Sequence, residues 1–362
     1  MTPKNKILVA PLNWGIGHAT RCIPIIQALL KEEYQPIIAS DGDALILLQQ
    51  EFPKLKTYQL PAYNIQYAKK GNYLKIKLAI QTPKILAAIK KEQKQLQEIV
   101  KKEHLKGIIS DNRFGIYSTQ VPSIYITHQV QVTSGVTTRI TTKLHQKIMK
   151  NFDEIWIPDY AKKPRLAGKL SENNKLKLKA RYIGILSRFK NEKKEEIKKY
   201  SVLVLLSGAE PQRSILEKII IKEFTNYSEK VLFVRGIVSE KQTIANTKNT
   251  TYINFLTQKE LEKAIKQSDF VVSRSGYSTV MDLAVLQKKV FFIPTPGQTE
   301  QEYIARHLQK LKIAPYASQA KFKLDDLQKI NAYTGFKMEV IRENKFPFAI
   351  FNKKNIENKS II

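Results

Sequence analysis

Short runs of apolar residues alternate with longer amphipathic stretches along most of this sequence. The first half has apolar runs at 6–10, 36–40 and 107–110, and the stretches between them carry apolar residues at helical spacing. Continuous apolar runs are typical of strands in a parallel sheet, which is covered by helices on both faces. The sequence therefore predicts an α/β protein with doubly wound sheets.

The alternation occurs twice, on either side of a lysine-rich, weakly periodic stretch at 159–199. It restarts with a strand predicted at 201–206. The 362 residues exceed one typical α/β core, and the hydrophobic fraction of 43% is enough for two. We expect an N-terminal domain with its linker over 1–185 and a second domain over 186–335. Residues 336–362 form a tail that the pattern leaves unassigned.

The formal net charge is +29, and lysines spread along predicted helices such as 74–103 supply most of it. A coding bias toward lysine, attraction to an anionic membrane surface and attraction to nucleic acid would each explain this charge, and only the charge favours the last of these. Arginine clusters interleaved with aromatic residues are missing, and the chain has no nucleic-acid motif. We therefore expect no specific nucleic-acid partner.

The single cysteine, Cys22, allows no disulfide within the chain and fits a reducing compartment. The apolar run at 6–10 is too short for the core of a signal peptide or for a membrane span. The expectation is a cytoplasmic protein, and a peripheral one at the inner membrane face if the charge serves membrane attraction.

The turn after the first predicted strand, P-L-N-W-G-I-G-H-A-T-R at 11–21, combines two glycines with His18 at a helix start. Asp111 follows the strand predicted at 107–110, and ligands of open parallel sheets bind at such strand ends. An imidazole there can act as a general base, and a carboxylate can orient it. The alternatives are a packing histidine and a helix cap. A dinucleotide fingerprint would need a third glycine where Thr20 stands.

A polar turn also follows the first predicted strand of the second domain. Ser207 and Gly208 open it, and Arg213 begins the next helix. Backbone N–H groups at a helix start and a guanidinium group suit a diphosphate. The alternative is a plain turn with a surface arginine.

The stretch 271–308 carries the sharpest pattern in the chain. A predicted strand ends at Arg274, Ser275 and Gly276 form a turn, and the following helix bears Asp282. An acid at that place can accept the hydroxyl groups of a ribose, as in dinucleotide-binding folds. The alternative is a solvated acid on a helix surface.

This stretch resembles the nucleotide-sugar-binding segment of the MurG-like glycosyltransferases, within their family-28 C-terminal domain. The shared pattern is a Ser-Gly turn after an arginine, a helix with an acid, a strand ending in Pro-x-Pro and a Gln-rich helix start. GIGH at 15–18 and SGAEPQR at 207–213 are similar to the family's glycine-rich turns, and SDNR at 110–113 resembles plant-type nucleotide-sugar transferases. The resemblance implies a GT-B fold of two Rossmann-like domains with a cleft between them, an inverting reaction and usually a UDP-sugar.

The motifs and the resemblance together assign donor binding to one set of residues: Gly17, Ser207, Gly208, Arg213, Phe255, Arg274, Ser275, Gly276, Asp282, Glu300 and Gln301. The resemblance implies that Phe255 holds the base through its backbone and that Gln301 touches the donor sugar. The family usually has Glu where Asp282 stands, and Glu300 replaces a second glutamine. The sugar is therefore left open between a hexose and an N-acetylhexosamine.

These roles give a mechanism of direct displacement at the anomeric carbon. His18, oriented by Asp111, removes the acceptor's hydroxyl proton, and the nucleotide diphosphate leaves as an anion stabilised by backbone N–H groups and arginines. No metal or other cofactor is expected, and the nucleotide-sugar is a substrate. The D-G-D sequence at 41–43 is interpreted as a helix cap. The acceptor is unknown, and a lipid-linked acceptor would suit a basic surface.

Two other functions remain open from the sequence. A nucleotide-sugar 2-epimerase on the same fold would use carboxylates around the sugar, for which Glu300, Glu302 and Asp111 are candidates. A catalytically silent nucleotide-binding or scaffold protein would keep the fold without the reaction. Release of UDP separates the transferase from the silent protein.

Overall fold

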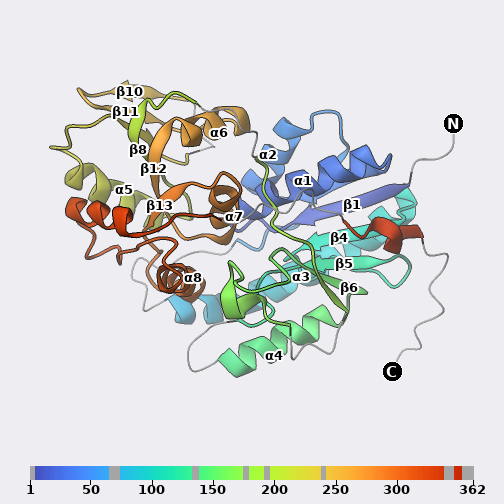
Figure 1. The fold of residues 1–362 in the computed structure, drawn as a ribbon. Coiled ribbons are helices and arrows are strands. Elements are labelled where there is room, and N and C mark those ends of the chain that lie inside the picture. The colour runs from blue at the N-terminus through green and yellow to red at the C-terminus, as the bar shows by residue number, and fades with distance from the viewer. Residues whose placement is uncertain are drawn as a thin grey trace. The chain divides into compact units, whose positions relative to one another are not determined.

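Figure 1 shows a computed structural model of the chain, which describes residues 5–64, 74–132, 138–173, 179–190, 196–237, 242–337 and 346–352. The chain divides into two compact units. The first unit comprises Met1–Ile65, Ile80–Leu186 and Ile341–Ile362, and the second comprises Gln66–Ala79 and Ser187–Val340.

Within the described residues the first unit contains a seven-stranded parallel sheet in the order β3-β2-β1-β4-β5-β6-β7. Its strands are β1 (Lys6–Pro11), β2 (Gln35–Ser40), β3 (Thr57–Gln59), β4 (Gly107–Asp111), β5 (Ser123–Ile126), β6 (Glu154–Ile157) and β7 (Ala180–Tyr182). The order reverses direction between β1 and β4, which is the point where doubly wound sheets bind their ligands.

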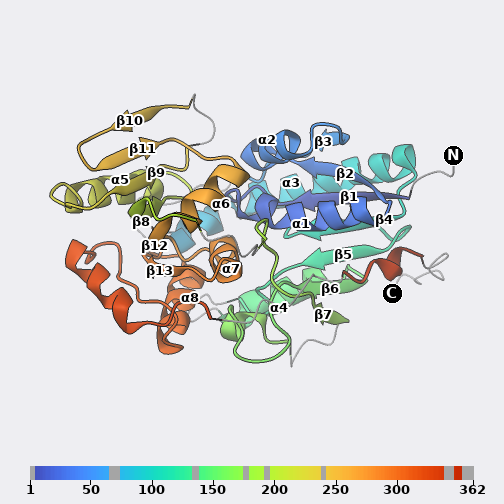
Figure 2. The same cartoon turned by 45° about the horizontal axis from the view of Figure 1, so that its top comes forward.

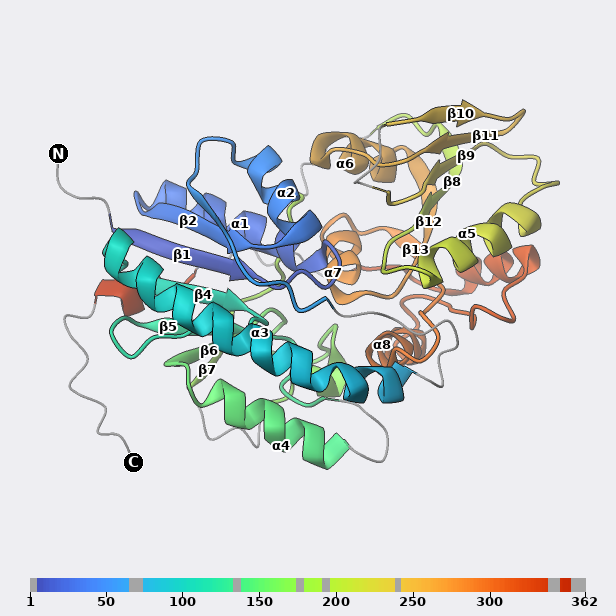
Figure 3. The same cartoon turned by 180° about the vertical axis from the view of Figure 1, so that it is seen from behind.

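Helices cover both faces of this sheet. They are α1 (Gly17–Lys31), α2 (Gly42–Glu51), α3 (Leu74–Glu103), α4 (Thr138–Met149) and the 3₁₀ turn η3 (Gly168–Ser171). Leu8 and Ile37 pack with Leu96 and Val100 of α3, and α3 runs along the strands in the view of Figure 3. Side chains alternate between the faces of a strand, so the neighbouring residues of β1 and β2 face the opposite side, where α1 contacts both strands.

The second unit contains a six-stranded sheet in the order β10-β11-β9-β8-β12-β13, parallel except for β10 (Figure 2). Its strands are β8 (Tyr200–Leu205), β9 (Val231–Val234), β10 (Ile244–Asn246), β11 (Thr250–Ile253), β12 (Ser268–Ser273) and β13 (Lys289–Phe292). Its helices are α5 (Gln212–Glu223), α6 (Gln258–Lys266), α7 (Tyr277–Val285), α8 (Thr299–Lys310) and the 3₁₀ segment η4 (Leu324–Ala332). Here the order reverses between β8 and β12.

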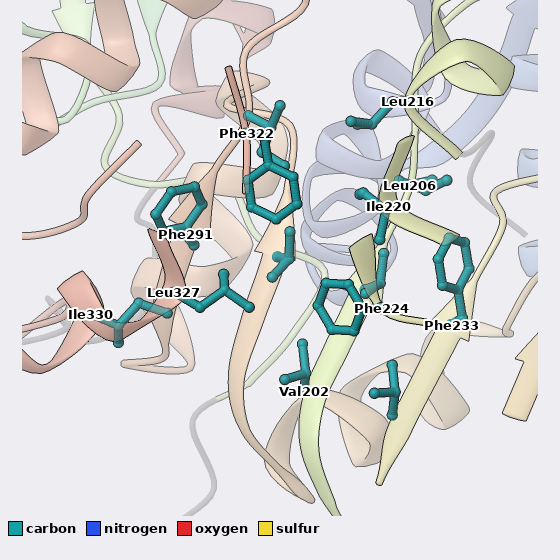
Figure 4. Packing of buried hydrophobic residues seen from close by; sticks show 14 residues of the cluster. Val202, Leu206, Leu216, Ile220, Phe224, Phe233, Phe291, Phe322, Leu327 and Ile330 are labelled. Carbon is teal, nitrogen blue, oxygen red and sulfur yellow. The ribbon is translucent and has the colours of Figure 1, made fainter. Parts of the chain in front are cut away.

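One face of the second sheet is closed by α5 and η4. Val202 and Phe233 of the strands pack with Leu216 and Ile220 of α5, and Phe322 and Leu327 close the other end of the same cluster (Figure 4). All of these side chains are buried. The burial of apolar side chains on both faces of each sheet confirms the predicted α/β class.

The tail that the sequence pattern left unassigned includes the 3₁₀ segment η5 (Phe348–Asn352). Phe348 and Phe351 are buried in the first unit, and the ring of Phe351 lies where a Cβ of Gly107 would stand. Other short elements, among them β3, β10, η3 and η4, also escaped the sequence pattern because each lacks a continuous apolar run. None of the helices in the described ranges combines the length and the apolar character needed to cross a membrane.

Candidate active site

The turn between β1 and α1 leaves room beside its backbone. Gly15 has a φ of +78°, and a Cβ built there would meet nothing within 4 Å. Helix α1 begins at Gly17 and has no side-chain cap at Ile16, so its first N–H groups are not covered by a capping side chain. His18 is the second residue of this helix, and its side chain is 15% exposed.

The structure brings His18 and Asp111 together. Pro11 of β1 pairs with Asp111 of β4, so the two strands end side by side where the sheet order reverses. The Nδ1 atom of His18 lies 3.1 Å from Oδ1 of Asp111. The catalytic role of the pair stays a prediction, but the contact that the role needs is present.

Arg21 is a member of this site that sequence reasoning missed. Its Nε donates to Oδ2 of Asp111 at 2.5 Å, and its Nη2 donates to Oδ1 of the same carboxylate. The same Nη2 lies 2.8 Å from Nδ1 of His18, and Nη1 lies 3.3 Å from Nδ1 of His128. His18 and Arg21 are three residues apart on one helix face, and this spacing is the only signal that could have found it.

Burial and charge set the protonation states of this group. Burial lowers the pKa of His18, and the Arg21 charge lowers it further against the opposing effect of Asp111. Burial alone would raise the pKa of Asp111, but Arg21 and His18 together bring it well below its usual range. The site at neutral pH therefore holds an ionised carboxylate, a guanidinium ion and an uncharged imidazole.

A second buried charge network lies at the same edge of the sheet. Arg113 donates to Asp41 at 2.6 Å and to Glu92 at 2.9 Å, and Tyr63 donates to Glu92 at 2.5 Å. Asp41 stands at the N-cap position of α2, but its side chain makes no cap hydrogen bond. The cap interpretation of the D-G-D sequence is therefore wrong, because Arg113 and Asn13 bind the Asp41 carboxylate instead.

In the second unit, Ser207 and Gly208 follow β8 as the sequence predicts. Gly208 has a φ of +107°, and a Cβ there would meet nothing within 4 Å. Arg213 lies in the first turn of α5, but its guanidinium donates to Glu210 and to Glu217, both at 2.7 Å. Arg213 thus has its charge neutralised by two carboxylates of the chain.

The turn after β12 places Gly276 at the N-cap of α7, again with nothing within 4 Å of a built Cβ. Ser275 is buried, and its hydroxyl donates to the backbone oxygen of Gln301 at 2.8 Å. Only the backbone of this turn can therefore face a diphosphate, while the Ser275 side chain joins the turn to α8.

Arg274 is 1% exposed and points into the unit. Its Nη1 donates to the backbone oxygens of Ile293 and Pro294, and its Nη2 donates to the backbone of Gln212 and to Oε1 of Gln319. All four acceptors are neutral oxygens, and Nε is buried without an acceptor. Burial lowers the pKa of Arg274 to about 9. The side chain thus joins the segments that contain Ile293–Pro294, Gln212 and Gln319. It makes these contacts inside the unit and does not reach toward a ligand.

The carboxylate of Asp282 already contacts side chains of the second unit. Its Oδ1 accepts the hydroxyl of Ser187 at 2.6 Å, and its Oδ2 lies 3.4 Å from Nε of Arg188. Burial raises the pKa of Asp282 more than Arg188 and Ser187 lower it. A ribose hydroxyl would share this carboxylate with Ser187 and Arg188. Arg188, which sequence reasoning missed, is a cation next to the predicted ribose acid.

The backbone of Phe255 is occupied by a side chain. The Nε2 atom of Gln242 donates to the Phe255 oxygen at 2.6 Å, and its Oε1 accepts the N–H groups of Asn254 and Phe255 at 3.2 and 3.4 Å. A primary amide thus binds the backbone edge that the sequence analysis assigned to the base.

Gln301 and Glu302 lie in the first turn of α8. The Oε1 atom of Gln301 accepts the N–H of Thr295 at 2.9 Å, and Oε1 of Glu302 accepts the N–H of Gly297 at 3.0 Å. Glu300 is part of the same turn and is half-buried. Across the described ranges, no three His, Cys, Asp or Glu side chains gather in a way that could hold a metal ion.

Comparison with known proteins matches residues 187–341 to the Glycosyltransferase family 28 C-terminal domain. An uncharacterized glycosyltransferase of Methanosarcina acetivorans is 24% identical over 318 residues, which span 82% of this chain and 81% of that protein. The UDP-N-acetylglucosamine–N-acetylmuramyl-(pentapeptide) pyrophosphoryl-undecaprenol N-acetylglucosamine transferase of Buchnera aphidicola is 23% identical over 252 residues, covering 68% of this chain and 66% of its own length.

Two solved structures share the fold. The chain superposes on Acinetobacter baumannii MurG with a TM-score of 0.51 and 14% identity, over 92% of this chain and 93% of that one. It superposes on the spinosyn rhamnosyltransferase SpnG complexed with thymidine diphosphate with a TM-score of 0.59 and 12% identity, again over 92% and 93%.

Proposed function

We propose that this chain is a MurG-like glycosyltransferase with the GT-B fold, and that it transfers a sugar from a UDP-sugar to an acceptor hydroxyl with inversion at the anomeric carbon. The observation that carries the proposal is the contact of His18 with the ionised Asp111 at the reversal point of the first sheet. A general base and its orienting acid are what such a displacement requires of the protein.

The second unit supplies the donor site in this proposal. The turns after β8 and β12 stand on either side of the reversal point of its sheet, and Gly208 and Gly276 leave open space there. The N-terminal N–H groups of α5 and α7 favour an anion. Arg274 adds a buried positive charge whose hydrogen-bond partners within the described residues are all neutral oxygens. These features support a diphosphate site that works without a resident metal.

The reaction then balances as a single displacement. The acceptor oxygen forms a bond to the anomeric carbon as the bond from that carbon to the diphosphate oxygen breaks. The acceptor proton passes to Nε2 of His18, while the Nδ1 proton faces Asp111, and UDP leaves as the anion. Asp111 stabilises the imidazolium that forms.

For the acceptor we propose a lipid-linked molecule at the cytoplasmic face of a membrane. The net charge of +29 supports attraction to anionic lipids, and the name of the Buchnera relative describes a lipid-linked acceptor for that protein. Sedimentation with anionic and with zwitterionic vesicles tests this, because the proposal requires binding to the anionic vesicles alone at moderate salt.

We do not favour the 2-epimerase. Two of its three candidate acids are already engaged, since Glu302 accepts the Gly297 amide and Asp111 is bound by Arg21. The proteins named above are transferases.

Calorimetric titration with UDP, dTDP and GDP tests the donor site, using wild type, Asp282→Asn and the exposed control Asp269→Asn. We expect UDP to bind wild type and the control with similar affinity and to bind Asp282→Asn at least tenfold more weakly. A panel of UDP-sugars assayed for UDP release with an acceptor extract follows. Folded wild-type protein that binds no nucleotide would overturn the proposal.

A further inference from the structure

Arg21 lies at the centre of the candidate base site. Its guanidinium binds Asp111 with two nitrogens in a fork, and the two outer nitrogens also approach Nδ1 of His18 and Nδ1 of His128. The side chain is 2% exposed. Since a side chain this buried cannot reach a substrate, its effect on the reaction has to pass through His18 and Asp111.

The position is unfavourable for a cation on local grounds. Arg21 is the fifth residue of α1, whose first turn carries no acidic residue, and the positive end of a helix dipole disfavours a cation there. Burial adds the larger cost of desolvating a charge. A residue that breaks local preference in this way is typical of functional sites. Here the carboxylate of Asp111, at the end of β4, offsets the cost of burying the Arg21 charge.

The contacts around Nδ1 of His18 cannot all be hydrogen bonds at once. A guanidinium group has donors only, so Arg21 can approach Nδ1 favourably only when Nδ1 carries no proton. The carboxylate of Asp111 can approach it favourably only when Nδ1 is protonated. Arg21 is the closer of the two, at 2.8 Å against 3.1 Å. Asp111 already accepts a hydrogen bond from Arg21 at each oxygen.

We propose that Arg21 is a positioning residue that holds His18 uncharged, with its proton on Nε2, in the enzyme without substrate. This rests on the proposed function, in which His18 must accept a proton at Nε2. The base-competent form, with the proton on Nδ1 facing Asp111, then has to displace the Arg21 contact. Arg21 thereby keeps the base unavailable until the acceptor binds.

The charged and titratable groups around His18 come from three elements. Arg21 and Cys22 belong to α1, Asp111 ends β4, and His128 follows β5. Burial raises the pKa of Cys22 well above its usual value, so its thiol stays neutral. Burial and Arg21 both lower the pKa of His18, in the same direction as the proposal requires.

Nitrogen-15 NMR of histidine-labelled protein tests the proposal without any need for activity. The His18 signals are assigned by their loss in His18→Asn. In wild type we expect the Nε2–H form and an imidazole that stays neutral below pH 6.5. Arg21→Met leaves Asp111 as the only partner, so the proton should move to Nδ1 and the pKa should rise by at least one unit.

Arg21→Met can unfold the protein, because it leaves a buried carboxylate unpaired. Arg21→Lys keeps the charge but offers a single point donor, so we expect it to fold, to keep the lowered pKa and to shift the proton to Nδ1. Arg181→Met, which removes a half-exposed arginine of the same unit, should change neither property.

The outcomes separate this inference from the proposed function. A wild-type His18 that carries its proton on Nδ1, or a pKa equal in wild type and Arg21→Met, would overturn the role of Arg21 even if the protein transfers sugar. The expected spectra in a protein that releases no UDP would instead sink the proposed function alone. In an active enzyme the acid limb of kcat/KM should move to higher pH in Arg21→Met, because protonation then inactivates the base sooner.

Discussion

The two sheets reverse their strand order at equivalent places, and both places hold a buried arginine with a different environment. At the β1/β4 point of the first unit, Arg21 is bound by the carboxylate of Asp111. At the β8/β12 point of the second unit, the part of the chain that the structure describes offers Arg274 neutral oxygens as its hydrogen-bond partners. Both arginines are at most 2% exposed.

The difference separates acid–base chemistry from anion binding. A paired arginine stabilises an ionised carboxylate and leaves the local charge balanced, which suits a site that must hold and move one proton. An arginine without a carboxylate leaves a positive charge in a poorly solvated place, as the lowered pKa of Arg274 indicates. Such a charge can stabilise a diphosphate that binds at the turns after β8 and β12.

The largest effect, on kcat, should come from the residue proposed to accept the proton. His18→Asn removes the proposed base, so we expect kcat to fall about 100- to 10,000-fold, the range typical of general-base catalysis. The affinity for UDP should stay unchanged, because all of the predicted donor residues except Gly17 belong to the second unit. Initial rates of UDP release and calorimetric titration measure the two quantities on the same preparation.

His104→Asn is the matched control for that variant. His104 is exposed in the first unit and has a φ of +52°, a conformation that asparagine also tolerates, so neither quantity should change. A His18→Asn enzyme that keeps more than about a tenth of the wild-type kcat would show that another group accepts the proton.

The next largest effect, on the affinity for UDP, should come from Arg274. Two unit charges about 8 Å apart interact by about 2 kcal/mol at an effective dielectric constant of about 20, which sets the scale expected for a buried cation near a diphosphate. We therefore expect Arg274→Gln to raise the Kd for UDP about 30-fold, and Arg274→Lys to keep most of the affinity. Thermal unfolding of each variant, run beside the titration, corrects for the loss of the carbonyl contacts.

A double substitution that leaves the net charge unchanged tests whether an arginine paired with a carboxylate contributes to UDP binding. Arg213→Gln with Glu210→Gln removes one positive and one negative charge from the same edge of the sheet, so the Kd for UDP should change less than threefold. Equal losses in Arg274→Lys and Arg274→Gln would show that the hydrogen-bond geometry of Arg274, and not its charge, supports the donor site.

The sequence pattern predicted most of the fold, because buried parallel strands are continuous apolar runs and their turns carry glycine. It also placed His18 and Asp111 at strand ends that meet. It could not predict Arg21 as a partner of Asp111, because the two residues are 90 positions apart and only the β1–β4 pairing joins them. The same holds for Gln242, whose amide binds a backbone edge on another segment.

The pairing of Arg213 with two carboxylates was foreseeable from the sequence. Glu217 follows Arg213 by four residues and Glu210 precedes it by three, which on a helix are the spacings of ion pairs. That pattern already predicts an arginine occupied within its own helix start. Arg274 has no such neighbour in the sequence, and its environment of backbone oxygens depends on loops that only the fold brings together.

The smallest effect should come from the amide that occupies the predicted base-binding edge. If the uracil base binds the backbone of Phe255, the amide of Gln242 must first leave it. If UDP has to displace only the 2.6 Å bond to the Phe255 oxygen, at about 1 kcal/mol net for a neutral hydrogen bond, Gln242→Ala should lower the Kd for UDP about fivefold. The prediction therefore runs opposite in sign to the substitutions at Arg274.

Two controls locate the gain at the base. Gln93→Ala breaks a similar amide-to-backbone contact, with Tyr117 in the first unit, and should leave UDP binding unchanged. Inorganic pyrophosphate carries the anionic part of the donor without a base, so its affinity should be the same in wild type and Gln242→Ala. A gain that appears with pyrophosphate too would mean that Gln242 acts on the anion site. Weaker UDP binding in Gln242→Ala would mean that the amide stays in place and contacts the nucleotide itself.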